Sequence, residues 1–479
     1  MGIPGSHTGH LPDGRAVGDR FDPRRGRPHR AGDPGDRHPD PDGRAQTRQR
    51  RKLRRPHLPY ALVAAAVAVA LAAALSACGG DGGGHHRFTL RIGDIVPLTG
   101  ALHDFGPPGR KAAELAVRQI DAAVRAAGAQ HMVTLQTADE RTDPGASVAA
   151  ARKLIRDGAS CIVGAWAAPD TMSVSQGVTT PDAVPQISPA STGMDITSLR
   201  DNGYLTRTAS PDSLQGGALA AEIAAALGGA AGRTVNVGAR ADPYGRSIST
   251  WFERAWKARG GRVGRQVLWD PSAPSYNSEA QSMVSGNPDA WVIADFPATY
   301  QRVAPALIRT GRWSARRTFF SDGLASATLP RDLGSAATEG MRGTAPGTAQ
   351  VGVLPRAFTK LYVSSPPRTV KRQTFDAQAF DATVLCYLAS VAAGKADGAA
   401  MKDRVRQVSA PPGTKYTWQQ LPEAIKDLED GKDVDYEGAS GPIDLDSHGD
   451  PTEGVYDVLQ FRNGTLVRLK QLTQRAAGR

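Results

Sequence analysis

Residues 131–167 read HMVTLQTADERTDPGASVAAARKLIRDGASCIVGAWA, and this stretch decides the fold class. Its two ends, 131–139 and 160–167, are rich in apolar and β-branched residues, as β-strands are. The segment between them, 144–158, has apolar residues at helical spacing and ends on a glycine, which is typical of a helix C-terminus. A strand, a helix and a second strand in this order predict a βαβ unit with parallel strands.

The same alternation extends over most of the chain. Further strands are predicted at 88–97, 233–240, 261–269, 289–296 and 316–322. Helices are predicted at 110–127 and from near Pro211, Tyr244, Asn277 and Pro297. One open sheet with so many strands would be unusually large. We therefore expect an α/β protein of two doubly wound lobes, each a parallel sheet covered by helices on both faces.

A second stretch, VPQISPASTGMDIT at 184–197, turns from an apolar strand into prolines, small hydroxyl residues and a glycine. Doubly wound lobes bind ligands at the carboxyl ends of their strands. Free backbone N–H groups and hydroxyls at such an end suit an anionic group. The alternative is a turn whose serine and threonine only cap the next helix.

The net charge of +11 is unevenly distributed along the chain. Residues 1–59 hold 14 basic and 7 acidic residues, whereas the chain from Cys78 onward holds 44 basic and 40 acidic residues. A surplus of 4 over so long a segment gives no support for a nucleic-acid partner.

The first 77 residues are expected to lie outside the folded body. Residues 1–50 have almost nothing to bury and predict a disordered leader, or a start codon assigned too far upstream. Residues 51–77 combine a basic segment with an apolar run, as a signal peptide does. A single transmembrane anchor is the alternative, because the run is close to the length that spans a bilayer. Either interpretation places the rest of the chain outside the cytoplasm.

The sequence LSAC, which ends at Cys78, resembles the lipobox of bacterial lipoproteins, in which the cysteine receives a lipid. The glycine-rich residues 78–86 then form a flexible tether. This resemblance implies a lipid-anchored protein on the extracytoplasmic face of the cell membrane.

Several segments, in their order along the chain, resemble the leucine/isoleucine/valine-binding type of periplasmic solute-binding protein. They are IGDIVPLTGALHDFGPPGRKAAELAVRQID (92–121), TDPGASVAAARKLIRDGASCIVGAWAAPDTMSV (142–174), VPQISPASTGMDIT (184–197), RTASPDSLQGGALAAEIA (207–224), DPYGRSISTWFERAWKARGG (242–261) and DYEGASGPIDLDSHGDPTEGVYDVLQFRNGTLV (435–467). The resemblance implies two lobes joined by three crossovers, near Ala209, Thr344 and Pro451. Lobe one would comprise 87–208 and 345–450, and lobe two 209–344 and 451–479.

The resemblance also implies a ligand site between the lobes. Ala168, Ala190 and Thr192 fall on the positions that hold a ligand carboxylate in relatives. Asp322 falls where relatives keep an acidic residue for the α-ammonium group. The aromatic lining of the cleft falls on Phe105, Tyr244, Phe296 and Phe375. Tyr244 and Phe375 have the alternative of being core residues, and Asp322 that of being a turn residue.

Departures from the family pattern leave the ligand open. Ala168 stands where many relatives have serine, and Phe105 and Phe296 replace hydroxylated aromatic residues. Trp166 either narrows the cleft or packs beneath the loop as core. Arg141 occupies a usual position of the family's small-loop disulfide, which is therefore expected to be absent.

The remaining motifs are interpreted as structural. Cys161 and Cys386 are expected to be inert, small apolar residues on a buried strand and a helix. The sequence DLDSHGD, 444–450, resembles a calcium loop, but Val455 replaces the last acidic ligand, so a turn is expected. The sequence RNGT, 462–465, predicts a type I′ hairpin turn.

The function expected from the resemblance is capture of a small ligand, such as an amino acid, a short amide, urea or an aromatic acid. The ligand would be delivered to an ABC permease by a monomeric, lipid-anchored receptor. The alternative is a receptor of the same fold that signals to a membrane partner. No nucleophile, base or metal constellation is recognisable, so an enzyme, a metal site and a cofactor are not expected.

Overall fold

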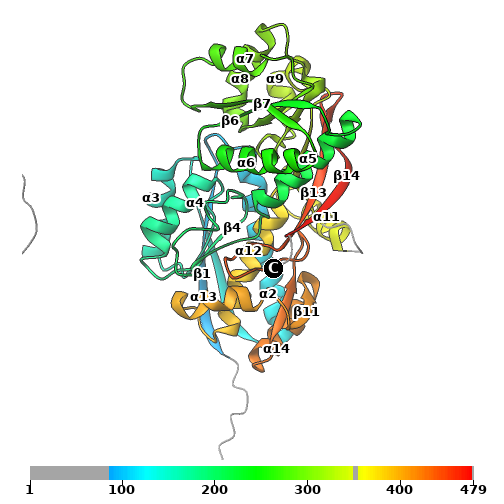
Figure 1. The fold of residues 1–479 in the computed structure, drawn as a ribbon. Helices are drawn as coiled ribbons and strands as arrows, with labels where there is room; N and C mark the ends of the chain where they lie inside the picture. Colours follow the sequence, from blue (N-terminus) through cyan, green and yellow to red (C-terminus); the bar gives the residue numbers. More distant parts are fainter. Residues whose placement is uncertain (1–85, 349–353, 477–479) are drawn as a thin grey trace, which may run out of the picture. The chain divides into compact units, whose positions relative to one another are not determined.

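A computed structural model of the protein describes residues 86–348 and 354–476 (Figure 1). The predicted leader, signal peptide, Cys78 and the tether up to residue 85 lie outside the described residues. Among the helices that are described, none is both long enough and apolar enough to cross a membrane.

The first sheet, as far as the chain is described, has five parallel strands. Their spatial order is β2 (Gln130–Asp139), β1 (Arg87–Val96), β3 (Cys161–Val163), β4 (Gln186–Ser188) and β5 (Leu205–Arg207). Side chains of successive strand residues point to opposite faces. Cys161 and Val163 accordingly belong to one core and Ile162 to another. The predicted βαβ unit at 131–167 is thus confirmed, and β1 lies between its two strands.

Helices cover both faces of this sheet. The larger core lies under α2 (Gly106–Ala127), α11 (Leu354–Ser364), α12 (Asp376–Ala392), α13 (Gly398–Gln407) and α14 (Leu421–Glu429). The opposite core lies under α3 (Pro144–Arg156) and α4 (Ala168–Val174). Figure 1 shows α2 and α12 side by side. The helix predicted at 110–127 starts earlier, at Gly106, because the prolines in its first turn suit positions whose N–H groups have no partner.

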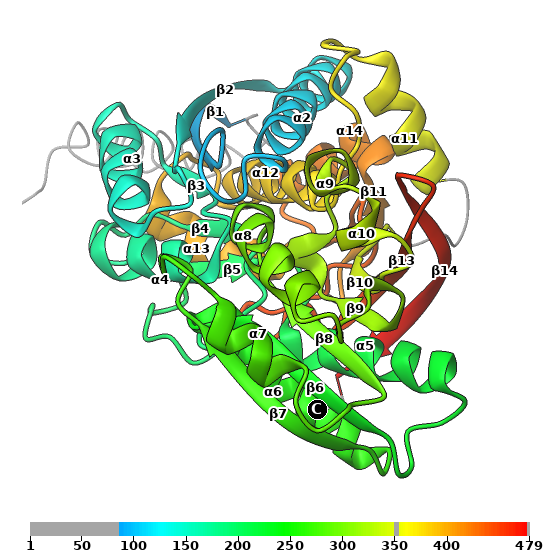
Figure 2. The same cartoon turned by 90° about the horizontal axis from the view of Figure 1, so that it is seen from above.

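The second sheet has seven strands within the described residues. Their order is β14 (Thr465–Arg475), β13 (Glu453–Arg462), β10 (Arg342–Pro346), β9 (Thr318–Phe320), β8 (Ala290–Ala294), β6 (Thr234–Arg240) and β7 (Arg262–Trp269). The strands from β10 to β7 are parallel, whereas β13 and β14 add an antiparallel hairpin at the β10 edge (Figure 2). Asn463 and Gly464 in its turn both have positive φ, which confirms the predicted type I′ turn.

Buried cores also lie on both faces of the second sheet. Val292 lies in the core under α5 (Asp212–Leu227) and α6 (Pro243–Ala258). Its neighbours Trp291 and Ile293 lie in the core under α7 (Asn277–Met283), α8 (Pro297–Arg309), α9 (Leu329–Leu333) and α10 (Ser335–Thr338). The predicted architecture of two α/β lobes is therefore confirmed. A small additional sheet pairs β11 (Thr414–Thr417) with β12 (Val434–Glu437).

The chain passes between the two sheets three times within the described residues. It leaves the first sheet after β5 to form α5, returns after β10 to form α11 and α12, and leaves again to form β13. Each half of the molecule is thus built from segments that are distant in sequence. The connections after β5 and before β13 bring Arg207 and Asp450 into an ion pair, with 2.7 Å between Nε and Oδ1.

The interpretation of the two cysteines as inert thiols was wrong. Cys161 in β3 and Cys386 in α12 form a disulfide across a sequence separation of 225 residues. Both residues are fully buried. No local spacing indicates this pair, because the two residues meet only when α12, which follows the second crossing, packs on the first sheet.

We expect loss of this cross-link to destabilise the protein. A Cys161→Ala/Cys386→Ala variant should lose about 2–4 kcal/mol of unfolding free energy, because the cross-link limits the conformations of the unfolded chain. Denaturant unfolding with and without dithiothreitol measures the difference. The matched control is the variant itself, whose stability the reductant should not change. Equal stability of the oxidised and reduced wild type would contradict the expectation.

Candidate functional site

All eight residues that the sequence assigns to a ligand site line one cavity. They are Phe105, Ala168, Ala190, Thr192, Tyr244, Phe296, Asp322 and Phe375. The sequence did not assign Leu102, Ala167, Ser191 and Gly323, which also line it. Trp166 is a further lining residue, so it borders the cleft and also packs as core over Gly109, where an added Cβ would lie 2.2 Å from the indole.

The cavity lies where strands of both sheets end. Ala168 follows β3 and Thr192 follows β4 in the first sheet, whereas Phe296 follows β8 and Asp322 follows β9 in the second. Carboxyl ends of parallel strands are where doubly wound sheets bind ligands. The cavity is narrow, about 20 Å³, which is room for about one water molecule. A larger ligand therefore requires the two walls to separate.

The wall from the first sheet offers hydrogen-bond donors. Among the described residues, the backbone N–H groups of Ala168 and Thr192 have no hydrogen-bond acceptor. The Thr192 hydroxyl is buried and also lacks a partner. Buried polar groups are nearly always hydrogen-bonded, so a group without a partner needs an explanation. These donors suit an anionic group of a ligand.

Neighbouring groups fix the loop that carries Thr192. The Ser191 hydroxyl donates to the Trp166 carbonyl at 2.9 Å and lies 2.7 Å from the Thr171 hydroxyl. Arg207 donates to the carbonyls of Ser191 and Gly193. The alternative interpretation of this loop as a cap for a following helix was wrong, because the next regular element is the strand β5.

The wall from the second sheet centres on Asp322, which is buried. The Tyr244 hydroxyl donates to the Asp322 carboxylate at 3.0 Å, accepts the Gly323 N–H at 3.1 Å and lies 2.7 Å from the Ser321 hydroxyl. Gly323 is required here, because a Cβ would come within 2.9 Å of both the Tyr244 hydroxyl and the Phe296 ring. Burial raises the pKa of Asp322 to about 7, aided by the nearby Asp212 and opposed by the hydrogen bond from Tyr244.

Aromatic rings form the rest of the wall. Tyr244 and Phe296 stack with centroids 5.1 Å apart. Phe375 meets Phe105 and Trp166 edge-on, at 6.3 Å in each case. Among the residues that the structure describes, no lysine, arginine or histidine lines the cavity. The cavity therefore combines an apolar surround, one acid and a set of N–H donors.

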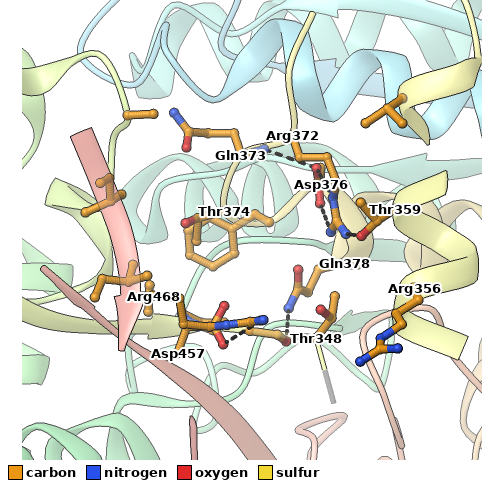
Figure 3. Close-up of a pocket in the computed structure, with 18 of the residues that line it drawn as sticks. Thr348, Arg356, Thr359, Arg372, Gln373, Thr374, Asp376, Gln378, Asp457 and Arg468 are labelled. Carbon is orange, nitrogen blue, oxygen red and sulfur yellow. Dashed lines mark hydrogen bonds and ion pairs between the residues drawn. The ribbon is translucent and has the colours of Figure 1, made fainter. Parts of the chain in front are cut away.

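A larger and more open groove, about 760 Å³, shares Phe375 with this cavity as a lining residue. Figure 3 shows Arg372 beside Asp376 and Arg468 beside Asp457 in this groove. Arg372 pairs with Asp376 at 2.6 Å, and Arg468 pairs with Asp457 at 3.5 Å. Its charged lining is thus largely engaged within the protein. We assign the ligand site to the smaller cavity, because the unpartnered donors and the buried acid converge there.

The segment whose sequence resembles a calcium loop is a turn in the structure. Residues 444–450 form a turn in which the Gly449 N–H donates to the Asp446 carbonyl. The Asp450 carboxylate is engaged by Arg207 and by the Thr197 hydroxyl. The described ranges contain no group of three or more acidic, histidine or cysteine side chains that could hold a metal ion.

Comparison with known proteins identifies relatives. A family model described as "Periplasmic binding protein" matches residues 89–456. A Leu/Ile/Val-binding protein homologue of Brucella melitensis is 35% identical over 108 residues, which are 22% of this chain and 28% of that protein. The match thus covers too little of that protein for its function to be assigned to this chain.

Two solved structures share the fold. The branched-chain amino acid substrate-binding protein LivJ of Streptococcus pneumoniae, in complex with isoleucine, has a TM-score of 0.64 and 18% identity, with 80% of this chain and 99% of that chain covered. A solute-binding protein of an ABC transporter from Rhodopseudomonas palustris, in complex with 3,4-dihydroxybenzoic acid, has a TM-score of 0.62 and 19% identity, with 81% and 98% covered.

The raised pKa of Asp322 predicts a pH-dependent stability. The folded state keeps a proton that the unfolded chain releases near pH ~4, so the free energy of unfolding falls as the pH rises from ~4 to about 7. The slope from one proton is at most ~1.4 kcal/mol per pH unit. Asp322→Asn should make this fall in the free energy of unfolding shallower, as measured by denaturant unfolding between pH ~5 and pH ~7. Exposed Asp270→Asn is the matched control, and an unchanged slope in Asp322→Asn would contradict the assignment.

Proposed function

We propose, from the premise that this chain belongs to the periplasmic binding protein family, that it is an extracytoplasmic receptor for a small amino-acid-like ligand. The ligand is held between the two lobes and delivered to an ABC permease. The single observation that carries this proposal is the convergence of donors from one sheet and an acid from the other on the same cavity. The relatives are solute-binding proteins, which supports binding rather than catalysis.

The two walls divide the recognition of the ligand. The N–H groups of Ala168 and Thr192 and the Thr192 hydroxyl donate charge-assisted hydrogen bonds to the ligand carboxylate. Asp322, oriented by Tyr244, accepts from the ligand ammonium group. The aromatic rings exclude water around both contacts and bury the apolar part of the ligand. A bound isoleucine in one relative and a bound dihydroxybenzoic acid in another indicate that a carboxylate is the shared feature.

Hinge motion provides entry and capture. Because the cavity is about 20 Å³, the ligand enters only when the lobes separate. The hinge is formed by the three connections between the sheets, near Ala209, Thr344 and Pro451. A ligand that contacts both walls binds the closed form better than the open form and shifts the equilibrium toward closure.

The N-terminal signal and the disulfide both support an extracytoplasmic, membrane-anchored location. Cys78 carries the lipid that anchors a monomeric receptor on the outer face of the membrane. The Cys161–Cys386 disulfide supports this location, because disulfides persist in oxidising compartments outside the cytoplasm.

Ligand binding is tested by a thermal-shift screen of amino acids, short amides, urea and aromatic acids, followed by calorimetry. For an amino acid, Asp322→Ala should weaken binding by about 2 kcal/mol or more, roughly 30-fold, because a desolvated ammonium group loses its partner. Thr192→Val should weaken binding of every carboxylate, and exposed Thr250→Val is its control. Unchanged affinity in Asp322→Ala would rule out its role, and no binding by any compound would rule out the function.

The lipid anchor has its own test. In a bacterial host that processes lipoproteins, Cys78→Ser should carry no lipid, because it has no acceptor sulfur. Metabolic labelling with a clickable fatty acid measures the modification directly. Cys161→Ser is the control and should stay labelled. Labelling of the Cys78→Ser protein would contradict the assignment.

A further inference from the structure

A second acid, Asp212, lies directly behind the Thr192 wall of the cavity. It is the first residue of α5 and is fully buried. Its backbone N–H donates to the Thr192 carbonyl at 2.9 Å, which joins a helix on the second sheet to the ligand loop of the first. The Asp212 carboxylate thus lies where the two lobes contact each other.

Both carboxylate oxygens of Asp212 lack a hydrogen-bond partner among the described residues. The hydroxyls of Thr192 and Ser247 lie beside them and favour the ionised form, although neither reaches hydrogen-bonding geometry. Ser247 accepts the Met194 N–H at 2.9 Å, so its own proton remains available to Asp212. A buried carboxylate without a full set of donors is costly, and protonation relieves that cost.

The charged and titratable groups around Asp212 do not supply a dedicated cation. Arg207 is near, but its guanidinium is engaged by Asp450, by two loop carbonyls and by Thr197. The other groups that face Asp212 are acids or phenols, and a negative charge on any of them opposes ionisation of Asp212. They are Asp195, Asp322, Tyr244 and Tyr456.

The Thr192 hydroxyl therefore lies between two acceptors when a carboxylate is bound. It has one proton to donate, and Asp212 and the ligand carboxylate would compete for it. Two carboxylates that share a buried site do not both remain ionised. Protonation of Asp212 resolves this competition, because the hydroxyl proton is then free for the ligand.

We propose that Asp212 is a proton-binding residue of the ligand site, which takes up a proton from solvent when a carboxylate binds at Thr192. The inference rests on the proposed function and narrows its ligand class. Monocarboxylates bind together with a proton, whereas a neutral amide or urea at the same position requires none. Asp212 acts through Thr192 and is thus a positioning and specificity residue.

The sign of the pH dependence follows. Burial raises the pKa of Asp212 to about 6 in the ligand-free protein, and a bound carboxylate raises it further. Near pH ~7 binding then takes up as much as one proton, and affinity falls by up to ~10-fold per pH unit as the pH rises. Near pH ~5 Asp212 is already protonated and contributes no uptake.

The experiment measures proton uptake by calorimetry near pH ~7 in two buffers of different ionisation enthalpy. The probes are L-isoleucine and 3,4-dihydroxybenzoate. Asp212→Asn should take up fewer protons than the wild type, by up to one per ligand, and should show a flatter affinity profile. Asp270→Asn, an exposed acid that is not among the groups facing Asp212, is the matched control and should behave as wild type.

A second measurement remains informative if Asp212→Asn does not fold. On the wild-type protein, 3,4-dihydroxybenzoate should bind with proton uptake near pH ~7, whereas the neutral 3,4-dihydroxybenzamide should bind with none. Equal proton counts in wild type and Asp212→Asn, or equal counts for the benzoate and the benzamide, would overturn the inference alone. No binding by either probe or by any compound of the screen would overturn the proposed function and this inference with it.

Discussion

The guanidinium of Arg207 is fully buried, and the geometry of the ligand cavity depends on its contacts. It pairs with Asp450 at 2.7 Å and donates to the carbonyls of Ser191 and Gly193, which flank Thr192. A buried charge is tolerated only when it is paired and hydrogen-bonded, and removal of one partner of such a pair typically costs about 3–5 kcal/mol. The donors at Thr192 are therefore held by a contact that also ties the loop to the connection before β13.

This anchor explains how one cavity is assembled from distant segments. Arg207 ends β5, just before the chain first leaves the first sheet, and Asp450 precedes its last passage to the second. The pair thus fastens two of the connections to each other and to the ligand loop. Closure around a ligand can then be a rigid-body motion of the lobes, since the loop does not have to reorganise.

Much of the fold was predictable from the sequence, because the alternation of apolar strands and amphipathic helices is a local signal. The eight cavity residues were predicted from the order of motifs that resemble a family, and the structure brings them together, although their role with a ligand stays a prediction. Asp212 was not assigned, although it lies in a quoted motif, because nothing local indicates that α5 starts behind Thr192. The Cys161–Cys386 pair was missed for the same reason, since only the topology brings β3 and α12 into contact.

Phe375 shows how the fold separates the small cavity from the open groove. Its φ of 72° is left-handed, a conformation that costs a non-glycine residue about 1–3 kcal/mol unless its surroundings impose it. The surroundings here are the edge-on contacts with Phe105 and Trp166, and the residue occupies the N-cap position of helix α12, which is buried from Asp376 to Val391. The ring therefore belongs to the walls of both spaces. Because aromatic packing holds the ring there, the polar groups at Thr192 and Asp322 stay shielded from the water-accessible groove. In an environment shielded from water, the protonation of a buried acid depends strongly on the charge of the ligand that binds beside it.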